Sequence, residues 1–259
     1  MREDPPKFRC RPAAPRIDSA SPAGAPLERS GALATGCWIE GENIEILTFT
    51  GGPFVQNTLL VVCEDGRTGL LVDPGAATPE ALAEARARDL DIAALLVTHA
   101  HLDHIDGLKE AKAETGAPIY LHPLDRPLYD NIANQALAFG VPCVEPPPPD
   151  IDLVPGTNIV FGGSEFEVLF APGHAPGHVI FVSTLHPVAL VGDVIFRGSI
   201  GRTDLPNGNY GVLMESIRSQ VLTLPPETRL YPGHGPETTV ALERDTNPFV
   251  LQLHGGRWV

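Results

Sequence analysis

A dense group of histidine and aspartate side chains is the feature that most constrains this chain. His99, His101, Asp103 and His104 stand within six residues, directly after the apolar stretch 92–98. Imidazole nitrogens and carboxylate oxygens are typical ligands of zinc and iron. A turn after a strand would let His99 and His101 point one way and Asp103 and His104 another. The cluster therefore predicts a metal site at the end of a strand, with room for two adjacent ions.

Three more polar residues occupy the same kind of position. His174 follows strand-like residues 166–171, Asp193 follows 188–191, and His234 follows Leu230-Tyr231, in each case directly after a glycine. Strand ends of an α/β sheet face a common crevice, and glycine lets the backbone approach closely. We therefore expect these three residues to join the cluster.

The rest of the chain alternates between strand-like and helix-like segments, which predicts an α/β fold. Strands are expected at residues 44–50, 58–63, 69–72, 92–98, 118–121, 158–161, 166–171, 179–183 and 188–191. Helices are expected at residues 78–88, 105–115, within 127–139, at 210–222 and near 237–244. Prolines at 146–149 predict an extended loop between two halves. Residues 1–35 are expected to form a flexible or surface-strapped arm, and residues 36–259 the folded domain.

Composition excludes several classes of protein. The 259 residues have a formal charge of −14, which argues against a nucleic-acid partner. No apolar run reaches the ~20 residues that cross a bilayer, and the first residues lack the apolar stretch of a secretory signal, so a cytoplasmic location is expected. Cys10, Cys37, Cys63 and Cys143 show no C-x-x-C spacing, which predicts free thiols.

Over residues 44–250 the sequence resembles the metallo-β-lactamase superfamily, and within it the short glyoxalase II-like hydrolases. The matching motifs are Leu71-Val72-Asp73-Pro74-Gly75, the residue 99–104 cluster, Pro172-Gly173-His174, Gly192-Asp193 and Gly233-His234. The resemblance implies a four-layer αβ/βα sandwich with the site at one edge between the sheets.

The resemblance also assigns the ligands. It implies a first ion on His99, His101 and His174, a second on Asp103, His104 and His234, and Asp193 as the bridge between them. Two zinc ions are expected, with iron or manganese as alternatives. Asp73 would support a ligand histidine by accepting its second N–H, as carboxylates near metal sites commonly do. His178, four residues after His174, is expected to be structural.

Such a site favours hydrolysis of an acyl compound, because bound metal lowers the pKa of water towards ~7 and polarises a carbonyl. Asp193 and Asp103 would be the catalytic carboxylates, with Asp103 a conceivable proton carrier. No residue is obviously placed to protonate a poor leaving group, which favours thioesters over unstrained amides. The resemblance points to S-2-hydroxyacylglutathione or a related small thioester as the substrate.

The thiol-binding part departs from the two-domain glyoxalase II pattern. Arg202 stands where those enzymes carry a basic residue, but Asp204 replaces their tyrosine two positions later. Arg202 is expected either to bind a substrate carboxylate or to pair with Asp204. Tyr129 and Phe139, within the segment 127–149, are expected to line an apolar substrate wall.

Three other functions remain open from the sequence. An iron-dependent persulfide dioxygenase could use His99, His174 and Asp193 on one iron. A lactonase or another esterase of the same fold would use the same ligands. A non-catalytic metal-binding protein on an inherited fold is the third possibility, and the sequence leaves the oligomeric state unknown.

Overall fold

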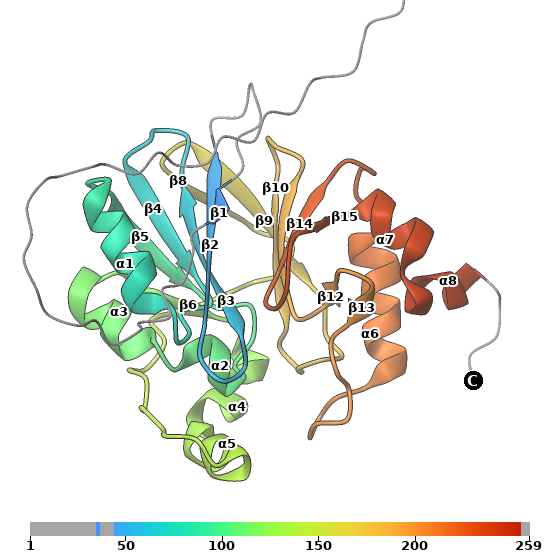
Figure 1. Ribbon diagram of the computed structural model, residues 1–259, viewed down its shortest axis with the longest axis horizontal. Helices are drawn as coiled ribbons and strands as arrows, with labels where there is room; N and C mark the ends of the chain where they lie inside the picture. Colours follow the sequence, from blue (N-terminus) through green and yellow to red (C-terminus); the bar gives the residue numbers. More distant parts are fainter. Residues whose placement is uncertain (1–34, 37–43, 255–259) are drawn as a thin grey trace, which may run out of the picture.

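The computed structural model of the protein describes residues 35–36 and 44–254, and in these ranges two β-sheets face each other with helices on both outer sides (Figure 1). The first sheet has seven strands in the order β1-β2-β3-β4-β5-β6-β7. Their bounds are β1 (Thr35–Gly36), β2 (Glu45–Gly51), β3 (Gln56–Val62), β4 (Thr68–Val72), β5 (Asp91–Leu96), β6 (Ile119–Leu121) and β7 (Ile151–Asp152). Strands β1 to β4 pair antiparallel, and β4 to β7 pair parallel.

The second sheet has six strands in the order β15-β14-β11-β10-β9-β8. Their bounds are β15 (Thr238–Thr239), β14 (Arg229–Pro232), β11 (Val188–Gly192), β10 (Val179–Ser183), β9 (Ser164–Phe170) and β8 (Asn158–Phe161). A short hairpin of β12 (Ile195–Phe196) and β13 (Ser199–Ile200) follows β11. Strand β11 pairs antiparallel with β10 and parallel with β14.

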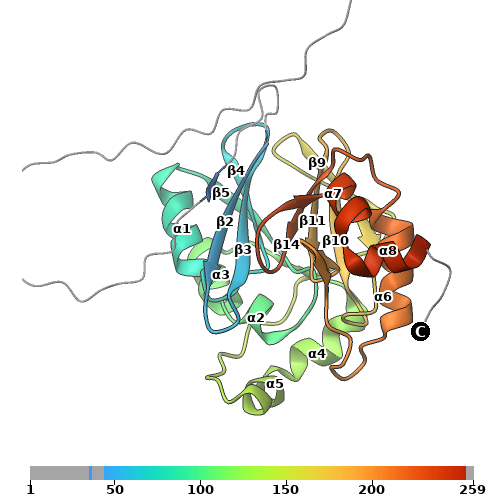
Figure 2. The same cartoon turned by 45° about the vertical axis from the view of Figure 1, so that its right-hand side comes forward.

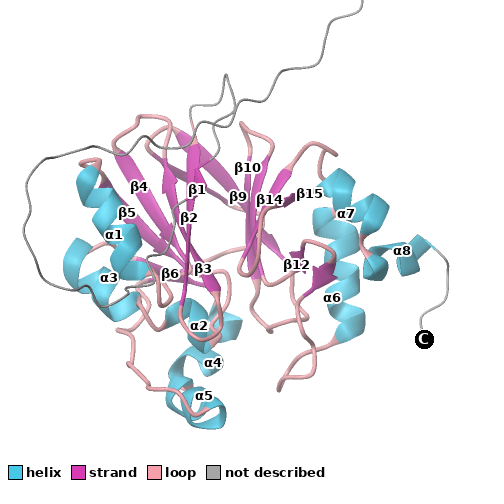
Figure 3. Ribbon diagram, viewed as in Figure 1, coloured by secondary structure: helices cyan, strands magenta, loops and turns pink. Residues whose placement is uncertain are grey.

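Helices cover the outer face of each sheet, as Figure 3 shows by secondary structure. On the first sheet these are α1 (Thr78–Ala87) and α3 (Leu108–Thr115), which connect parallel strands as such connections require. On the second sheet they are α6 (Tyr210–Ser216), the π-helical turn Ile217–Val221, α7 (Val240–Thr246) and α8 (Pro248–His254). Below the sheets lie α2 (Leu102–Ile105), the 3₁₀ turn Pro123–Asp125, α4 (Arg126–Asp130) and α5 (Ile132–Phe139) (Figure 2).

Three buried clusters correspond to the three contacts between the four layers. Leu60 and Leu71 point to α1 and α3, whereas Leu59 and Val61 point to the second sheet. Alternate residues of a strand face opposite sides, so both faces of β3 are covered and all seven of its residues are buried. Leu213 on α6 belongs to the third cluster, between the second sheet and its helices. The expected α/β fold, a four-layer αβ/βα sandwich, is confirmed.

Several expected elements differ in detail. The helix expected at 105–115 begins only at Leu108, and a separate short helix, α2, ends at Ile105; between them Gly107 donates to the carbonyl of Pro74 at 2.9 Å and approaches too closely for a side chain. A Cβ at Gly107 would lie 2.2 Å from Oγ1 of Thr78. The helix expected near 237–244 begins only at Val240, after β15, and α8 was not predicted.

The expected arm, residues 1–35, lies outside the described residues except for Thr35, whose backbone pairs with Thr48. Of the four cysteines, Cys63 and Cys143 are within the described ranges, and both are free thiols. Within the same ranges, no helix has the length and apolar character needed to cross a membrane.

Candidate metal centre

The predicted ligands come from the ends of four strands and from α2. Strands β9, β11 and β14 run in the same direction, since β10 is antiparallel to both β9 and β11 and β14 is parallel to β11. His174, Asp193 and His234 follow these three strands and therefore reach the same edge of the second sheet. The loop after β5 carries His99 and His101 to the same place from the first sheet. The N–H of Val179 joins the two sheets there by donating to the carbonyl of Thr98 at 2.9 Å.

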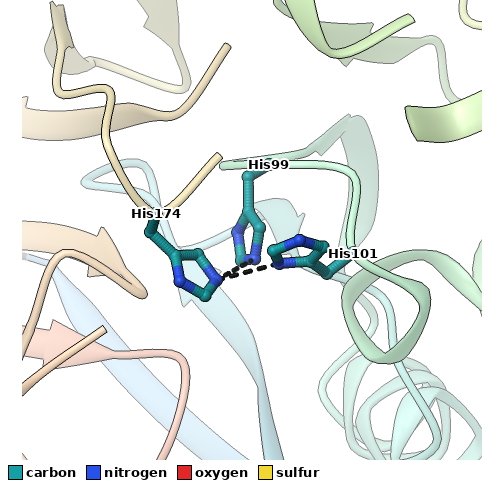
Figure 4. Close-up of side chains that lie close together, drawn as sticks. All are labelled: His99, His101 and His174. Carbon is teal, nitrogen blue, oxygen red and sulfur yellow. Dashed lines mark hydrogen bonds between the residues drawn. The ribbon is translucent and has the colours of Figure 1, made fainter. Parts of the chain in front are cut away.

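Three histidines form one compact set, drawn in Figure 4. Nε2 of His174 lies 2.9 Å from Nδ1 of His101 and 3.2 Å from Nε2 of His99. Donors bonded to one zinc ion at about 2.0–2.1 Å stand roughly 3.3 Å apart in a tetrahedron. All three side chains are buried, so the set has the donor spacing and the exclusion from solvent that are typical of a metal site.

A second, acid-rich set lies beside the first. Its members are Asp103, His104 and His234. Oδ2 of Asp103 is 3.2 Å from Nε2 of His234 and 3.9 Å from Nε2 of His104. Asp193 stands between the two sets, because its Oδ2 is 3.4 Å from Nε2 of His174 and 3.4 Å from Nε2 of His234. The structure thus brings all seven predicted ligands together, in the two groups that the resemblance implied.

Hydrogen bonds orient the ligand histidines. Nδ1 of His174 donates to the carbonyl of Arg202 at 2.7 Å, and Nδ1 of His234 donates to the carbonyl of Phe54 at 3.1 Å. Nδ1 of His104 contacts Oδ2 of Asp73 at 2.9 Å. In the neutral imidazole, an oxygen acceptor at Nδ1 selects the tautomer whose Nε2 has no proton and faces the site, which is the form that binds metal.

Asp73 lies behind His104, where the sequence placed it as a support. Its Oδ1 accepts the N–H of Thr98 at 2.7 Å, and its Oδ2 accepts the hydroxyl of Thr98 at 2.7 Å. Both carboxylate oxygens of Asp73 are therefore occupied by Thr98 and by the Nδ1 side of His104, not by the Nε2 side that faces the site. The backbone of Asp73 has φ of 50°, a left-handed conformation in which aspartate and asparagine are the favoured side chains other than glycine.

The donor set fits a pair of cations. Nε2 of His104 and Oδ1 of Asp193 are buried, have no hydrogen-bond partner and lie 3.5 Å apart. A buried polar atom without a partner is costly, and a bound cation would satisfy both atoms at once.

Charge differs between the two sets. Burial, followed by the neighbouring imidazoles, lowers the pKa of His99 well below its usual value, so its imidazole is neutral and ready to bind metal. Burial opposes protonation of His104 too, but the carboxylates of Asp193, Asp103 and Asp73 raise its pKa well above the usual value. The acid-rich set thus attracts positive charge strongly.

Glycine makes the tight approach of these loops possible. A Cβ at Gly233 would lie 2.3 Å from Oδ1 of Asp193 and 2.5 Å from Cε1 of His104. A Cβ at Gly192, where φ is 47°, would lie 2.4 Å from Oγ1 of Thr98. Ligand atoms occupy the space at Gly233, and Thr98 and His178, which lie behind the ligands, occupy it at Gly192.

Two buried residues hold the ligand loops from behind. Oδ2 of Asp125 accepts the N–H of Ala100 at 2.8 Å, and its Oδ1 accepts the N–H of Gly177. Asp125 thereby ties the loop of His99 and His101 to the loop of His174, and burial raises the pKa of its carboxyl to about 6. The sequence reasoning missed Asp125, because no motif marks a carboxylate that binds only backbone.

His178 is the second of these residues, and it has the structural position that the sequence suggested. Its Nε2 accepts the N–H of Asp193 at 3.0 Å, and its ring stacks on His99 at 4.6 Å between ring centroids. It therefore fixes the backbone of a ligand and supports the ring of another.

A cavity of about 290 Å³ opens directly onto the ligands. Besides ligands, its lining comprises Phe54, Leu102, Gln135, Phe139, Phe196, Ser199, Ile200, Arg202 and Leu205. Phe139 and Arg202 thus lie where the sequence expected substrate contacts. Phe54 and Phe196 were missed, although Phe196 stands between Asp193 and Arg202 in the sequence and could have been found there.

Tyr129 is a correction. It does not line this cavity but is buried in the core between the first sheet and its helices, with 3% of its surface exposed. Its hydroxyl donates to the carbonyl of Pro147 at 2.6 Å. The ring faces inward because it lies on the apolar side of α4, so the hydroxyl holds the proline-rich loop instead of meeting substrate.

Comparisons with known proteins agree with this geometry. The profile described as "Metallo-beta-lactamase superfamily" matches residues 51–234. Hydroxyacylglutathione hydrolase GloC of Haemophilus influenzae is 37% identical over 210 residues, which cover 80% of this chain and 98% of that protein. Among solved structures, BLEG-1 B3 metallo-beta-lactamase superposes with a TM-score of 0.75 at 33% identity, over 79% of this chain and 99% of that one. TTHA1623 in a di-iron-bound form gives a TM-score of 0.71 at 42% identity, over 78% and 98% of the two chains.

Proposed function

The chain belongs to the metallo-beta-lactamase superfamily and is a metallo-hydrolase of that fold, and from its site we propose that it hydrolyses small thioesters. S-2-hydroxyacylglutathione is the thioester that the relatives suggest, because GloC carries that activity in its name. The proposal concerns a small-molecule substrate and involves neither nucleic acid nor a membrane.

The two ligand sets would hold two ions, which we propose to be zinc, with iron as the first alternative given the di-iron-bound form of TTHA1623. Such ions lower the pKa of bound water and polarise a carbonyl, which is the chemistry that acyl hydrolysis needs. Asp193 lies within 3.5 Å of nitrogens from both sets and would hold the two sets at a fixed distance from each other. The Nδ1 contacts of His174 and His234 with backbone carbonyls fix the direction from which their Nε2 atoms bind.

One observation carries the choice of a thioester. Among the described residues that line the cavity, the carboxylates and imidazoles all belong to the ligand sets, and the remaining polar side chains are Gln135, Ser199 and Arg202. None of these three is a good proton donor near neutral pH. A thiol with a pKa near ~8.5 can leave as thiolate without an acid, whereas an amine cannot.

Asp103 is the one carboxylate of the site that could also carry a proton. It has 17% of its side chain exposed, more than Asp193 with 8%, and it lines the cavity. Burial would raise its pKa, but His104 and His234 lower it below the usual value. Asp103 is thus ionised at neutral pH, where it can bind metal or accept a proton but does not donate one to a leaving amine.

Metal analysis together with a matched substrate panel tests this proposal. The protein would be purified without added metal, analysed for zinc, iron and manganese, and then assayed with the thioester, oxygen ester and amide of one acyl group. We expect about two ions per chain and hydrolysis of the thioester well above that of the amide, abolished by a chelator and restored by metal. Amide cleavage at a comparable rate would contradict the leaving-group argument.

The same protein also discriminates the oxygenase alternative. A persulfide dioxygenase would hold a single iron and consume oxygen with glutathione persulfide, whereas the proposed hydrolase would not. Oxygen uptake matched to persulfide loss, without thioester hydrolysis, would overturn the proposal.

A further inference from the structure

We propose that the cleft selects thioesters with an uncharged, apolar thiol part over anionic ones such as glutathione thioesters, and that Asp204 sets this preference by occupying Arg202. The inference rests on the proposed thioesterase function and concerns the substrate class of the same site.

The first observation is an aromatic wall built from three distant segments. Phe54 comes from the turn between β2 and β3, Phe139 from the end of α5 and Phe196 from β12, and all three line the cavity. The rings of Phe54 and Phe139 meet edge to face at 5.4 Å, and Phe196 meets the ligand His234 in the same way at 5.9 Å. This wall therefore continues directly into the metal centre.

Part of this wall is open to solvent. Phe139 has 44% of its surface exposed, and Phe54 and Phe196 are half-buried. Exposed aromatic side chains beside a reactive centre are typical of a site for an apolar ligand group, since covering them removes apolar surface from water. Leu102, Ile200 and Leu205 fill the remaining apolar lining.

The second observation concerns charge. Among the described residues that line this cavity, Arg202 is the single Lys or Arg side chain. Its Nε donates to Oδ1 of Asp204 at 2.8 Å, and its Nη2 donates to Oδ2 of Asp204 at 2.8 Å. These are the two parallel bonds that a substrate carboxylate would otherwise take from a guanidinium.

Asp204 holds that position across the working pH range. The hydrogen bonds from Arg202 and from its own backbone lower the pKa of Asp204 to about 2, so it is ionised at neutral pH. An anionic thiol part would meet the Arg202–Asp204 ion pair, which has no net charge and whose guanidinium donors are already bonded. An apolar thiol part would meet the rings of the three phenylalanines. Both side chains are more than half exposed, and an exposed pair contributes little to folding, so the pair can be altered without unfolding the chain.

The experiment uses the metal-loaded protein and one acyl group, D-lactoyl, on three thiols: glutathione, N-acetylcysteamine and benzyl mercaptan. Each kcat/KM is divided by the hydroxide-catalysed rate of the same thioester, which removes differences in leaving group. We expect the wild type to prefer the benzyl thioester over the glutathione thioester by about tenfold, with N-acetylcysteamine between them.

Asp204→Asn tests the role of the ion pair. It frees Arg202 and should raise the ratio of glutathione to benzyl efficiency by about tenfold, mainly through a lower KM for the glutathione thioester. The double variant Asp204→Asn with Arg202→Ala should lose this gain, because the gain depends on the guanidinium. Phe139→Ala should move the ratio in the same direction as Asp204→Asn, but by lowering the efficiency for the benzyl thioester.

A second exposed ion pair supplies the control. Arg218 and Glu215 on the second-sheet side form a similar two-bonded contact outside the cavity lining, so Glu215→Gln should leave the ratio unchanged.

Three results would separate failure of this inference from failure of the proposed function. A wild type that favours the glutathione thioester overturns the inference but supports a thioesterase. An unchanged ratio in Asp204→Asn shows that Asp204 does not set the preference and also overturns it. Absence of hydrolysis of all three thioesters by the metal-loaded wild type overturns the proposed function itself.

Discussion

The metal centre and the cavity wall are built in different ways. At the centre, five of the seven proposed ligands have no more than 9% of their surface exposed, the exceptions being His234 and Asp103, and carboxylate or backbone carbonyl groups orient the rings of His104 and His174. On the wall, Phe139 and Arg202 are exposed and come from a helix end and a loop. Strand ends thus position the proposed metal ligands, and loops position the side chains proposed to contact substrate. Changes at the centre should act through metal binding, and changes on the wall through specificity.

Replacing Asp193 with Ala should have the largest effect. Asp193 lies beside nitrogens of both ligand sets, so its loss removes the carboxylate between the two proposed ion positions. We expect activity to fall by more than about a hundredfold, together with loss of bound metal, because the effect should exceed the 10–100-fold typical of residues behind the ligands. Metal content and thioester hydrolysis measure this. Asp245→Ala, an exposed carboxylate on α7, is the control and should change neither.

Asp73 tests the layer behind the ligands. Its left-handed backbone makes Asp73→Asn the cleaner change, since asparagine adopts that conformation and alanine would add strain. The amide removes the negative charge facing Nδ1 of His104, and we expect a loss of about 10–100-fold in activity or metal affinity. Chelator competition at matched folding, checked by circular dichroism, gives the affinity. A loss equal to that of Asp193→Ala would contradict the ranking of the two carboxylates.

Asp125 tests whether metal binding depends on the hydrogen bonds that join the loop of His99 to the loop of His174. Asp125→Asn keeps the shape, but its NH₂ group must face either Ala100 or Gly177, whose N–H groups both need an acceptor. One lost bond of this kind costs about 1–3 kcal/mol, so metal affinity should fall by roughly tenfold. Melting of the metal-free protein reports the purely structural cost, and competition with a chelator reports the affinity. Lower melting with unchanged affinity would show that Asp125 serves folding alone.

Much of the centre could be predicted from the sequence because its position follows from general geometry. Apolar runs end one to two residues before His99, His174 and Asp193, and parallel strand ends must meet at one edge. The support by Asp73 followed from the resemblance and from the ordinary need of a ligand imidazole for an acceptor.

The wall was harder to predict. Tyr129 and Phe139 lie in the same segment, and only the turn of the helices decides that one ring faces the core and the other the cavity. Phe54 reaches the cavity through the turn between two strands, 45 residues or more from every ligand in the sequence. Contacts of this kind depend on how loops pack in three dimensions, which periodicity does not report.

The smallest effect is expected where the wall itself is anchored. Oε2 of Glu243 on α7 accepts the N–H of Gly198, at the tip of the β12–β13 hairpin, at 2.9 Å. The same oxygen accepts Nδ2 of Asn247 at 2.8 Å, and Asn247 also donates to the carbonyl of Ser199 at 2.9 Å. The hairpin carries Phe196 into the cavity, so a buried carboxylate on an outer helix holds part of the substrate wall.

Glu243→Gln should therefore change specificity and leave the metal centre intact. Both bonds go to one oxygen, so the amide oxygen of glutamine can keep them only as weaker bonds to a neutral acceptor, while its NH₂ group replaces the Oε1 that accepts the hydroxyl of Thr238. A net loss of about 0.5–1.5 kcal/mol corresponds to a roughly two- to tenfold rise in KM for an apolar thioester. Metal content should stay at the wild-type value, in contrast to Asp125→Asn, which also changes a buried carboxylate that accepts backbone N–H groups. Glu237→Gln, which alters the partly exposed pair with Arg229, is the control and should leave KM unchanged. Loss of metal from Glu243→Gln would show that metal binding depends on the position of the β12–β13 hairpin. The cavity wall and the metal centre would then not be independent of each other.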